Sequence, residues 1–136
     1  MRKFALAALA AITVAVSAVS GSPASAAPAA PAAASVIVTF DAKGEIFRAR
    51  LDDAASIQVA RELLAGTAQY PAHPNGTIVY GSARENVGWS WHLEDTFMAD
   101  ISAEVCDGLP SDVEKHAITV PYFCPWGAEV IAIQNV

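Results

Sequence analysis

Ser90, His92 and Glu94 stand close together in the chain and are the residues that most suggest catalysis. Hydrolases activate a serine with a histidine that a carboxylate orients. One hypothesis is therefore a small hydrolase centred on His92, with Ser90 or Glu104 as its partner. Ser90 lies in Trp-Ser-Trp, however, and not in the Gly-x-Ser-x-Gly turn that exposes a catalytic serine. We predict no catalytic residue and a protein that is not an enzyme.

The residues with metal-binding side chains are not spaced as in known metal sites. His73, His92 and His116 show neither the i, i+4 nor the His-x-His spacing of a zinc site. Carboxylates are frequent after Trp91, but they form no Asp-x-Asp-x-Asp-Gly calcium loop. These carboxylates are Glu94, Asp95, Asp100, Glu104 and Asp107. We interpret them as solvated turn and cap residues, and a calcium site is the alternative. No metal and no cofactor is predicted.

Cys106 and Cys124 are the two cysteines of the chain. Their separation matches no CxxC redox or zinc spacing, although a reactive thiol or a metal-ligand pair remains the alternative. In an exported protein, two such cysteines favour a disulfide. The bridge would close a loop of about 19 residues and contribute ~3 kcal/mol of stability.

An aromatic segment, residues 121–126, surrounds Cys124 and carries a proline on either side of it. It has two interpretations. Phe123 and Trp126 could close the end of the core, or Tyr122 and Trp126 could stay partly exposed on a loop that the disulfide holds rigid. Rigid aromatic side chains lose little entropy on docking and therefore bind partners well. Inhibitors of proteases also present loops of this kind.

The N-terminus has the pattern of a secretory signal peptide over residues 1–26. Arg2 and Lys3 precede an apolar run over residues 4–19, and Ala24-Ser25-Ala26 is a small-x-small cleavage site. The run is shorter than the roughly 20 residues that span a bilayer, so we predict cleavage near Ala26 and secretion.

Cleavage leaves about 110 residues, enough for one domain with its own core. It removes two basic residues, so the net charge changes from −6 to −8, six basic residues against fourteen acidic ones. This balance argues against nucleic acid and membrane partners, because both need clustered Lys and Arg. We expect a monomer.

The chain after the signal peptide divides into an Ala/Pro-rich flexible leader, residues 27–35, and a single domain, residues 36–136. The domain opens with a predicted β-hairpin, residues 36–51, around the turn 41–44. A helix should follow, capped by Asp52 or Asp53 and ended by Gly66.

Four more strands and a second helix are expected after this helix. The clearest strand is residues 88–93, whose alternation places Trp89, Trp91 and Leu93 on one core-facing side. The remaining elements are strands over 77–80, 101–105 and 129–133 and a short helix over 110–116. The predicted fold is α+β, an antiparallel sheet of about six strands with two helices packed against it and one disulfide.

The chain resembles a family of small secreted proteins labelled calmodulin-binding-like, found in actinomycetes and lower eukaryotes. Four motifs between Val36 and Ile133 carry the likeness: Gly76-Thr77-Ile78, Gly88-Trp89-Ser90-Trp91-His92-Leu93, Glu104-Val105-Cys106-Asp107 and Cys124-Pro125-Trp126. The family has Phe in place of Trp91 and Trp in place of Phe123. The resemblance implies no active-site residue. Calmodulin targets are basic amphipathic helices, and Arg61 is the only cation of the first predicted helix, so calmodulin binding is not expected.

These observations favour a secreted, non-enzymatic binding module that engages an extracellular protein or other ligand through the disulfide-tied aromatic loop. The predicted binding residues are Tyr122, Phe123, Trp126 and His92. The first alternative is an inhibitor of an extracellular protease, and the second is the hydrolase centred on His92.

Overall fold

The computed structural model describes residues 34–136. The predicted signal peptide and most of the predicted leader lie outside these residues. Within residues 34–136, no helix has the length and apolar character needed to cross a membrane.

The first sheet, sheet A, contains the predicted hairpin. Strands β1 (Val36–Ala42) and β2 (Glu45–Leu51) pair antiparallel, with Phe40 opposite Phe47. Lys43 and Gly44 both have positive φ, as a tight two-residue hairpin turn requires, and Gly44 N–H donates to Asp41 Oδ1 at 2.6 Å. Strand β6 (Ala128–Asn135) pairs with the other edge of β1, so the order is β2-β1-β6.

The second sheet, sheet B, has the order β4-β3-β5 and is also antiparallel. Strand β3 (His73–Tyr80) begins in the predicted loop, and β4 (Trp91–Ala99) begins after Trp89. Strand β5 (Tyr122–Phe123) lies in the predicted aromatic loop. The predicted strand over 101–105 is wrong, because this segment pairs with no strand of residues 34–136 and the 3₁₀ helix η1 (Glu104–Cys106) begins within it.

The two predicted helices are present. Helix α1 (Ala54–Ala65) is capped by Asp53, whose side chain accepts from Ser56 N–H, and it ends at Gly66 in the left-handed conformation. Helix α2 (Pro110–Glu114) is shorter than predicted. The first turn of α2 leaves backbone N–H groups without a partner in the helix. Glu45 of β2 accepts from the N–H and the hydroxyl of Ser111 in this turn, at 2.7 and 2.8 Å.

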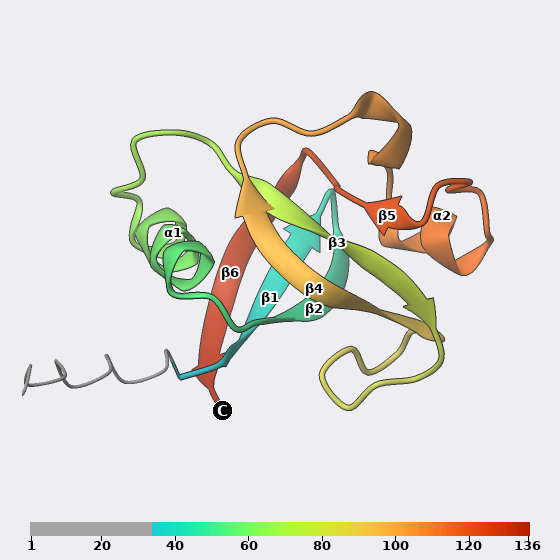
Figure 1. Cartoon of the computed structure of the whole chain (residues 1–136), viewed down its shortest axis with the longest axis horizontal. Coiled ribbons are helices and arrows are strands. Elements are labelled where there is room, and N and C mark those ends of the chain that lie inside the picture. The colour runs from blue at the N-terminus through green and yellow to red at the C-terminus, as the bar shows by residue number, and fades with distance from the viewer. Residues whose placement is uncertain (1–33) are drawn as a thin grey trace, which may run out of the picture. The chain divides into compact units, whose positions relative to one another are not determined.

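The core lies between the two sheets, which cross each other in Figure 1. Phe47 of sheet A stacks on Phe40 and contacts Trp91 and Phe123 of sheet B. Trp91 is fully buried, as predicted, whereas Trp89 is half-buried in the preceding turn. Helix α1 contributes Ile57 and Ala60 to the core. The α+β class, the six strands, the two helices and the disulfide are confirmed, and the strands form two sheets of three.

Gly76 lies at an irregularity of the β3–β4 pairing, where the strands leave no room for a side chain. A Cβ there would lie 2.9 Å from Thr96 Oγ1 and 3.1 Å from Leu93 Cβ. Gly76→Ala should therefore lower the free energy of unfolding by about 2 kcal/mol, measured by urea denaturation. Gly127→Ala is the matched control, since its Cβ would meet only the flexible Lys43 side chain. Equal stability of the two variants would contradict the prediction.

Candidate functional site

The Cys106–Cys124 disulfide joins η1 to the chain just after β5 and confirms the predicted bridge. Its two Cα atoms are 5.2 Å apart and both cysteines are buried. The backbone supports the same contact, because Cys124 N–H donates to Cys106 C=O at 2.8 Å. A disulfide is typical of proteins in an oxidising or extracellular environment.

The aromatic segment, residues 121–126, is partly buried in the core and partly exposed, so each of its two interpretations is correct for some of its residues. Phe123 is fully buried between Phe47 and Trp91, so it supports the core and cannot be a contact residue as predicted. Pro125 is also buried. Tyr122 and Trp126 are 52% and 47% exposed, on either side of this buried stretch.

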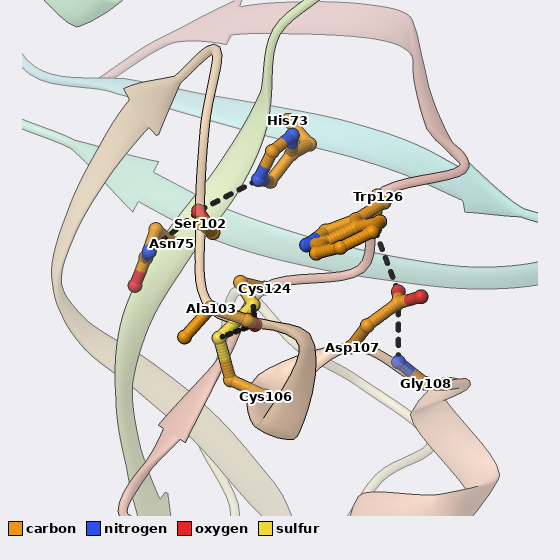
Figure 2. Close-up of a disulfide and its surroundings, with 9 residues drawn as sticks. All are labelled: His73, Asn75, Ser102, Ala103, Cys106, Asp107, Gly108, Cys124 and Trp126. Atoms are coloured by element: carbon orange, nitrogen blue, oxygen red, sulfur yellow. Dashed lines mark hydrogen bonds between the residues drawn. A yellow bond between two sulfur atoms is a disulfide. The ribbon is translucent and has the colours of Figure 1, made fainter.

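Trp126 is held in place through its backbone. Its N–H donates to Asp107 Oδ1 at 2.8 Å, and the same oxygen accepts from Gly108 N–H at 2.9 Å. The indole lies beside the His73 ring, with 6.5 Å between the ring centroids. Figure 2 shows the Trp126 ring next to His73 and close to the disulfide. Trp126 is therefore an exposed aromatic side chain on a fixed backbone.

A polar cluster next to Trp126 was not predicted. Ser102 Oγ lies 2.7 Å from His73 Nε2 and accepts from Asn75 Nδ2 at 2.9 Å, so it sits between two residues of β3 (Figure 2). These hydrogen bonds attach the segment after β4 to β3. His73 and Ser102 are 29 residues apart in the chain, and no local pattern predicts their contact.

Three hollows that share lining residues lie in this region, with volumes of about 390, 260 and 360 Å³. Ala72 lines all three, Asp100 lines the first and second, and Pro71 and Trp126 line the second and third. We call these three hollows together the Trp126 groove. His73 and Ser102 line its middle hollow.

The groove exposes large apolar side chains. Tyr70 is 69% exposed and Ile101 is 82% exposed, and together with Trp126 they lie along the groove. Large apolar side chains gathered around a depression are typical of binding surfaces. Ile101 was not predicted to lie at the surface, because its alternation with Ala103 and Val105 is typical of a strand.

The other predicted binding residues lie elsewhere. His92 is opposite Val79, toward the end of β3 that is remote from His73, about 20 Å along the strand. Its Nδ1 lies 2.9 Å from Gly81 C=O and its Nε2 lies 3.6 Å from Glu94. Tyr122 is opposite Thr77 and does not line the three hollows.

The structure does not join the residues of the predicted hydrolase. Ser90 donates through its hydroxyl and its N–H to Glu114, at 2.7 and 3.1 Å, and these hydrogen bonds lower the pKa of Glu114. Glu104 lies in η1, not on a strand beside β4. The serine–histidine contact of the candidate site is Ser102 with His73. Among residues 34–136, no group of three or more His, Cys, Asp or Glu side chains is arranged to hold a metal ion.

His73 makes stability depend on pH. Burial lowers its pKa, while the negative charges of Asp107 and Asp100 oppose this shift. The unfolded chain therefore binds the proton more tightly than the folded protein. Stability should fall as the pH drops below about 6.5 and stop falling below the folded pKa. Urea denaturation from pH 8 to 5 tests this, and His73→Gln should flatten the pH profile in that window. An unchanged profile would contradict it.

Comparison with known families gives a match to the model of the BP-74 N-terminal domain, over residues 33–136. Searches of curated proteins and of solved structures give no match. The family match covers both sheets, both helices and every residue of the Trp126 groove.

Proposed function

The chain belongs to the family of BP-74 N-terminal domains, and we propose that it acts as a secreted, monomeric, non-enzymatic domain that binds an extracellular protein in the Trp126 groove. The observation that supports this proposal best is the half-exposed Trp126 on a backbone fixed by Asp107 and the neighbouring disulfide. A side chain that is already ordered loses little entropy when a partner packs against it. The disulfide is consistent with export, and the N-terminal sequence pattern supports secretion.

The middle hollow suits an apolar side chain of the partner. It has a volume of about 260 Å³ and its walls include Pro71, Ile101 and Trp126. His73 and Ser102 add polar atoms at the same hollow, which can orient a bound backbone or side chain. An apolar anchor beside a few fixed polar groups is the usual composition of a binding hot spot.

Selection of displayed random peptides on the immobilised domain tests the proposal. Selected peptides should lose affinity by about 30-fold or more for Trp126→Ala, because a central aromatic hot spot contributes ~2 kcal/mol. Tyr122→Ala is the matched control, an exposed aromatic residue of the same segment outside the groove. It should leave affinity unchanged. Circular dichroism would verify that both variants are folded.

Two outcomes would contradict the proposal. If the selection yields no specific peptide, the groove is not a polypeptide-binding site. If the peptides lose affinity with Tyr122→Ala but not with Trp126→Ala, binding takes place outside the groove.

Inhibition of a protease receives less support. A substrate-like loop needs several consecutive exposed residues to lie along the protease cleft. Phe123, Cys124 and Pro125 are instead buried between Tyr122 and Trp126. We expect no inhibition when the protein is incubated with a panel of secreted proteases.

A second candidate function, hydrolysis of an ester or amide by Ser102, is favoured by the 2.7 Å contact between Ser102 Oγ and His73 Nε2. Burial lowers the pKa of His73, which favours the neutral ring that can accept a proton. A fluorophosphonate probe separates the two functions. Labelling that Ser102→Ala abolishes would support hydrolysis and contradict the non-enzymatic proposal.

A further inference from the structure

We infer that the segment bound in the Trp126 groove is cationic, with Lys or Arg side chains on both sides of an apolar anchor. This inference rests on the proposed function and identifies the chemistry of the partner. It is carried by the distribution of charge along the three hollows.

Each hollow has a carboxylate in its wall. Glu62 lines the first hollow, Asp100 the first and second, and Glu129 the third. No Lys or Arg is among the residues that line these three hollows. Lys43 packs near Gly127 but lines a separate hollow with Asp107 and Asp112. Carboxylates are therefore the only fully charged side chains that line the groove.

The carboxylates are available to a partner. Asp100 and Glu129 are exposed and Glu62 is half-buried, and none of the three forms a salt bridge within residues 34–136. The Glu62 side chain accepts one hydrogen bond, from Gln58 Nε2 at 2.7 Å. By contrast, the exposed Asp52 is paired with Arg50.

The three carboxylates of the groove are accompanied by apolar side chains that line the same hollows. Val59, Met98 and Tyr70 line the first hollow, Ile101 and Trp126 the second, and Leu63 and Val130 the third. A partner that places an apolar side chain beside Trp126 brings its flanking residues next to Asp100 and Glu129. Cations at those positions gain an attractive interaction, and anions are repelled. Since exposed ion pairs are weak, three of them should together change affinity by about tenfold.

Three synthetic peptides of about 12 residues test the inference. All share the same Trp and Leu anchors, and the residues between the anchors are Lys in one peptide, Gln in the second and Glu in the third. At low salt, the Lys peptide should bind about tenfold more tightly than the Gln peptide, and the Glu peptide more weakly than both. High salt should remove most of this difference.

Charge reversal in the groove supplies the second measurement. Asp100→Lys should remove most of the preference for the Lys peptide. Glu85→Lys is the matched control, because it makes the same change in net charge on a residue that lines a different hollow, with Arg48 and Arg84. It should leave the preference intact. If Glu85→Lys reduces the preference as much as Asp100→Lys, net charge is responsible and the inference is wrong.

The remaining outcomes separate this inference from the proposed function. Equal binding of the three peptides, lost for each with Trp126→Ala, would overturn the cationic partner and leave the groove as the binding site. Binding of none of the three would overturn the inference, and the displayed-peptide selection would still decide whether the groove binds polypeptides.

Discussion

Asn86→Ala is expected to lower the free energy of unfolding by about 2–4 kcal/mol, although Asn86 lies in a loop without regular structure. The side chain is 1% exposed and joins the two sheets. Its Oδ1 accepts from Arg48 N–H of β2 at 2.8 Å, and its Nδ2 donates to Trp91 C=O of β4 at 3.0 Å. Alanine would leave both backbone groups without a partner beside the core, and urea denaturation measures the loss.

Asn86 also protects an exposed sheet edge. Strand β2 is at the edge of sheet A, and its outward backbone groups would otherwise be open to other chains. Asn86 Oδ1 accepts from Arg48 N–H, and Trp89 Nε1 donates to Ile46 C=O at 2.8 Å, so both backbone groups of β2 already have a partner. We therefore expect Asn86→Ala to aggregate more readily as well, which light scattering would detect.

Asn86→Asp provides the control. It keeps the acceptor for Arg48 N–H but replaces the amide donor with a carboxylate oxygen facing Trp91 C=O. Burial should raise the folded pKa of this carboxyl, so the loss of stability should increase as the pH rises above about 4 and diminish at lower pH. Loss of stability that does not depend on pH would show that the donor to Trp91 is not the important contact.

Removal of the disulfide, by Cys106→Ala with Cys124→Ala, is expected to lower the free energy of unfolding by about 3 kcal/mol. The two cysteines are 18 residues apart, and the bridge restricts this loop in the unfolded chain. The urea midpoint should fall by about 1–3 M, and reduction of the wild-type protein should reproduce the shift. An unchanged midpoint would contradict a stabilising role for the bridge.

The same double variant should weaken peptide binding, because the bridge holds the chain that leads to Trp126 against η1. Asn86→Ala is the matched control: it is destabilised through lost contacts to Arg48 and Trp91, lines none of the three hollows and keeps the bridge. Under conditions where both proteins are folded, the cysteine variant should bind the selected peptides more weakly than Asn86→Ala. Equal affinity would mean that Asp107 alone positions Trp126.

Local features of the chain were sufficient to predict several elements. The turn residues around Lys43 and Gly44 predicted the β1–β2 hairpin, and Asp53 and Gly66 marked the ends of α1. The two cysteines predicted the bridge. These predictions succeeded because each depends on backbone preferences and capping within a few residues, or on the only pairing of cysteines that the chain allows.

Alternation of apolar and polar residues was misleading where no partner strand was available. Ile101 and Val105 alternate as in a strand, yet they are 82% and 67% exposed and pair with none of the strands that the structure describes. Tyr122 and Phe123 form a strand only because the edge of β3 is free to pair with them. Strand formation is decided by hydrogen-bonding partners elsewhere in the chain, which periodicity does not reveal.

The sequence by itself determined the α+β class, the hairpin, the ends of α1, the bridge and the aromatic segment around it. Only the tertiary structure decided that six strands form two sheets, that Phe123 is buried, and that Trp126 stands beside His73 and Ser102 while His92 lies far along the sheet. The groove joins residues from four separate segments, within residues 59–63 of α1, 68–73, 98–102 and 126–130. Their proximity follows from strand pairing and core packing, which are long-range interactions that no short segment encodes.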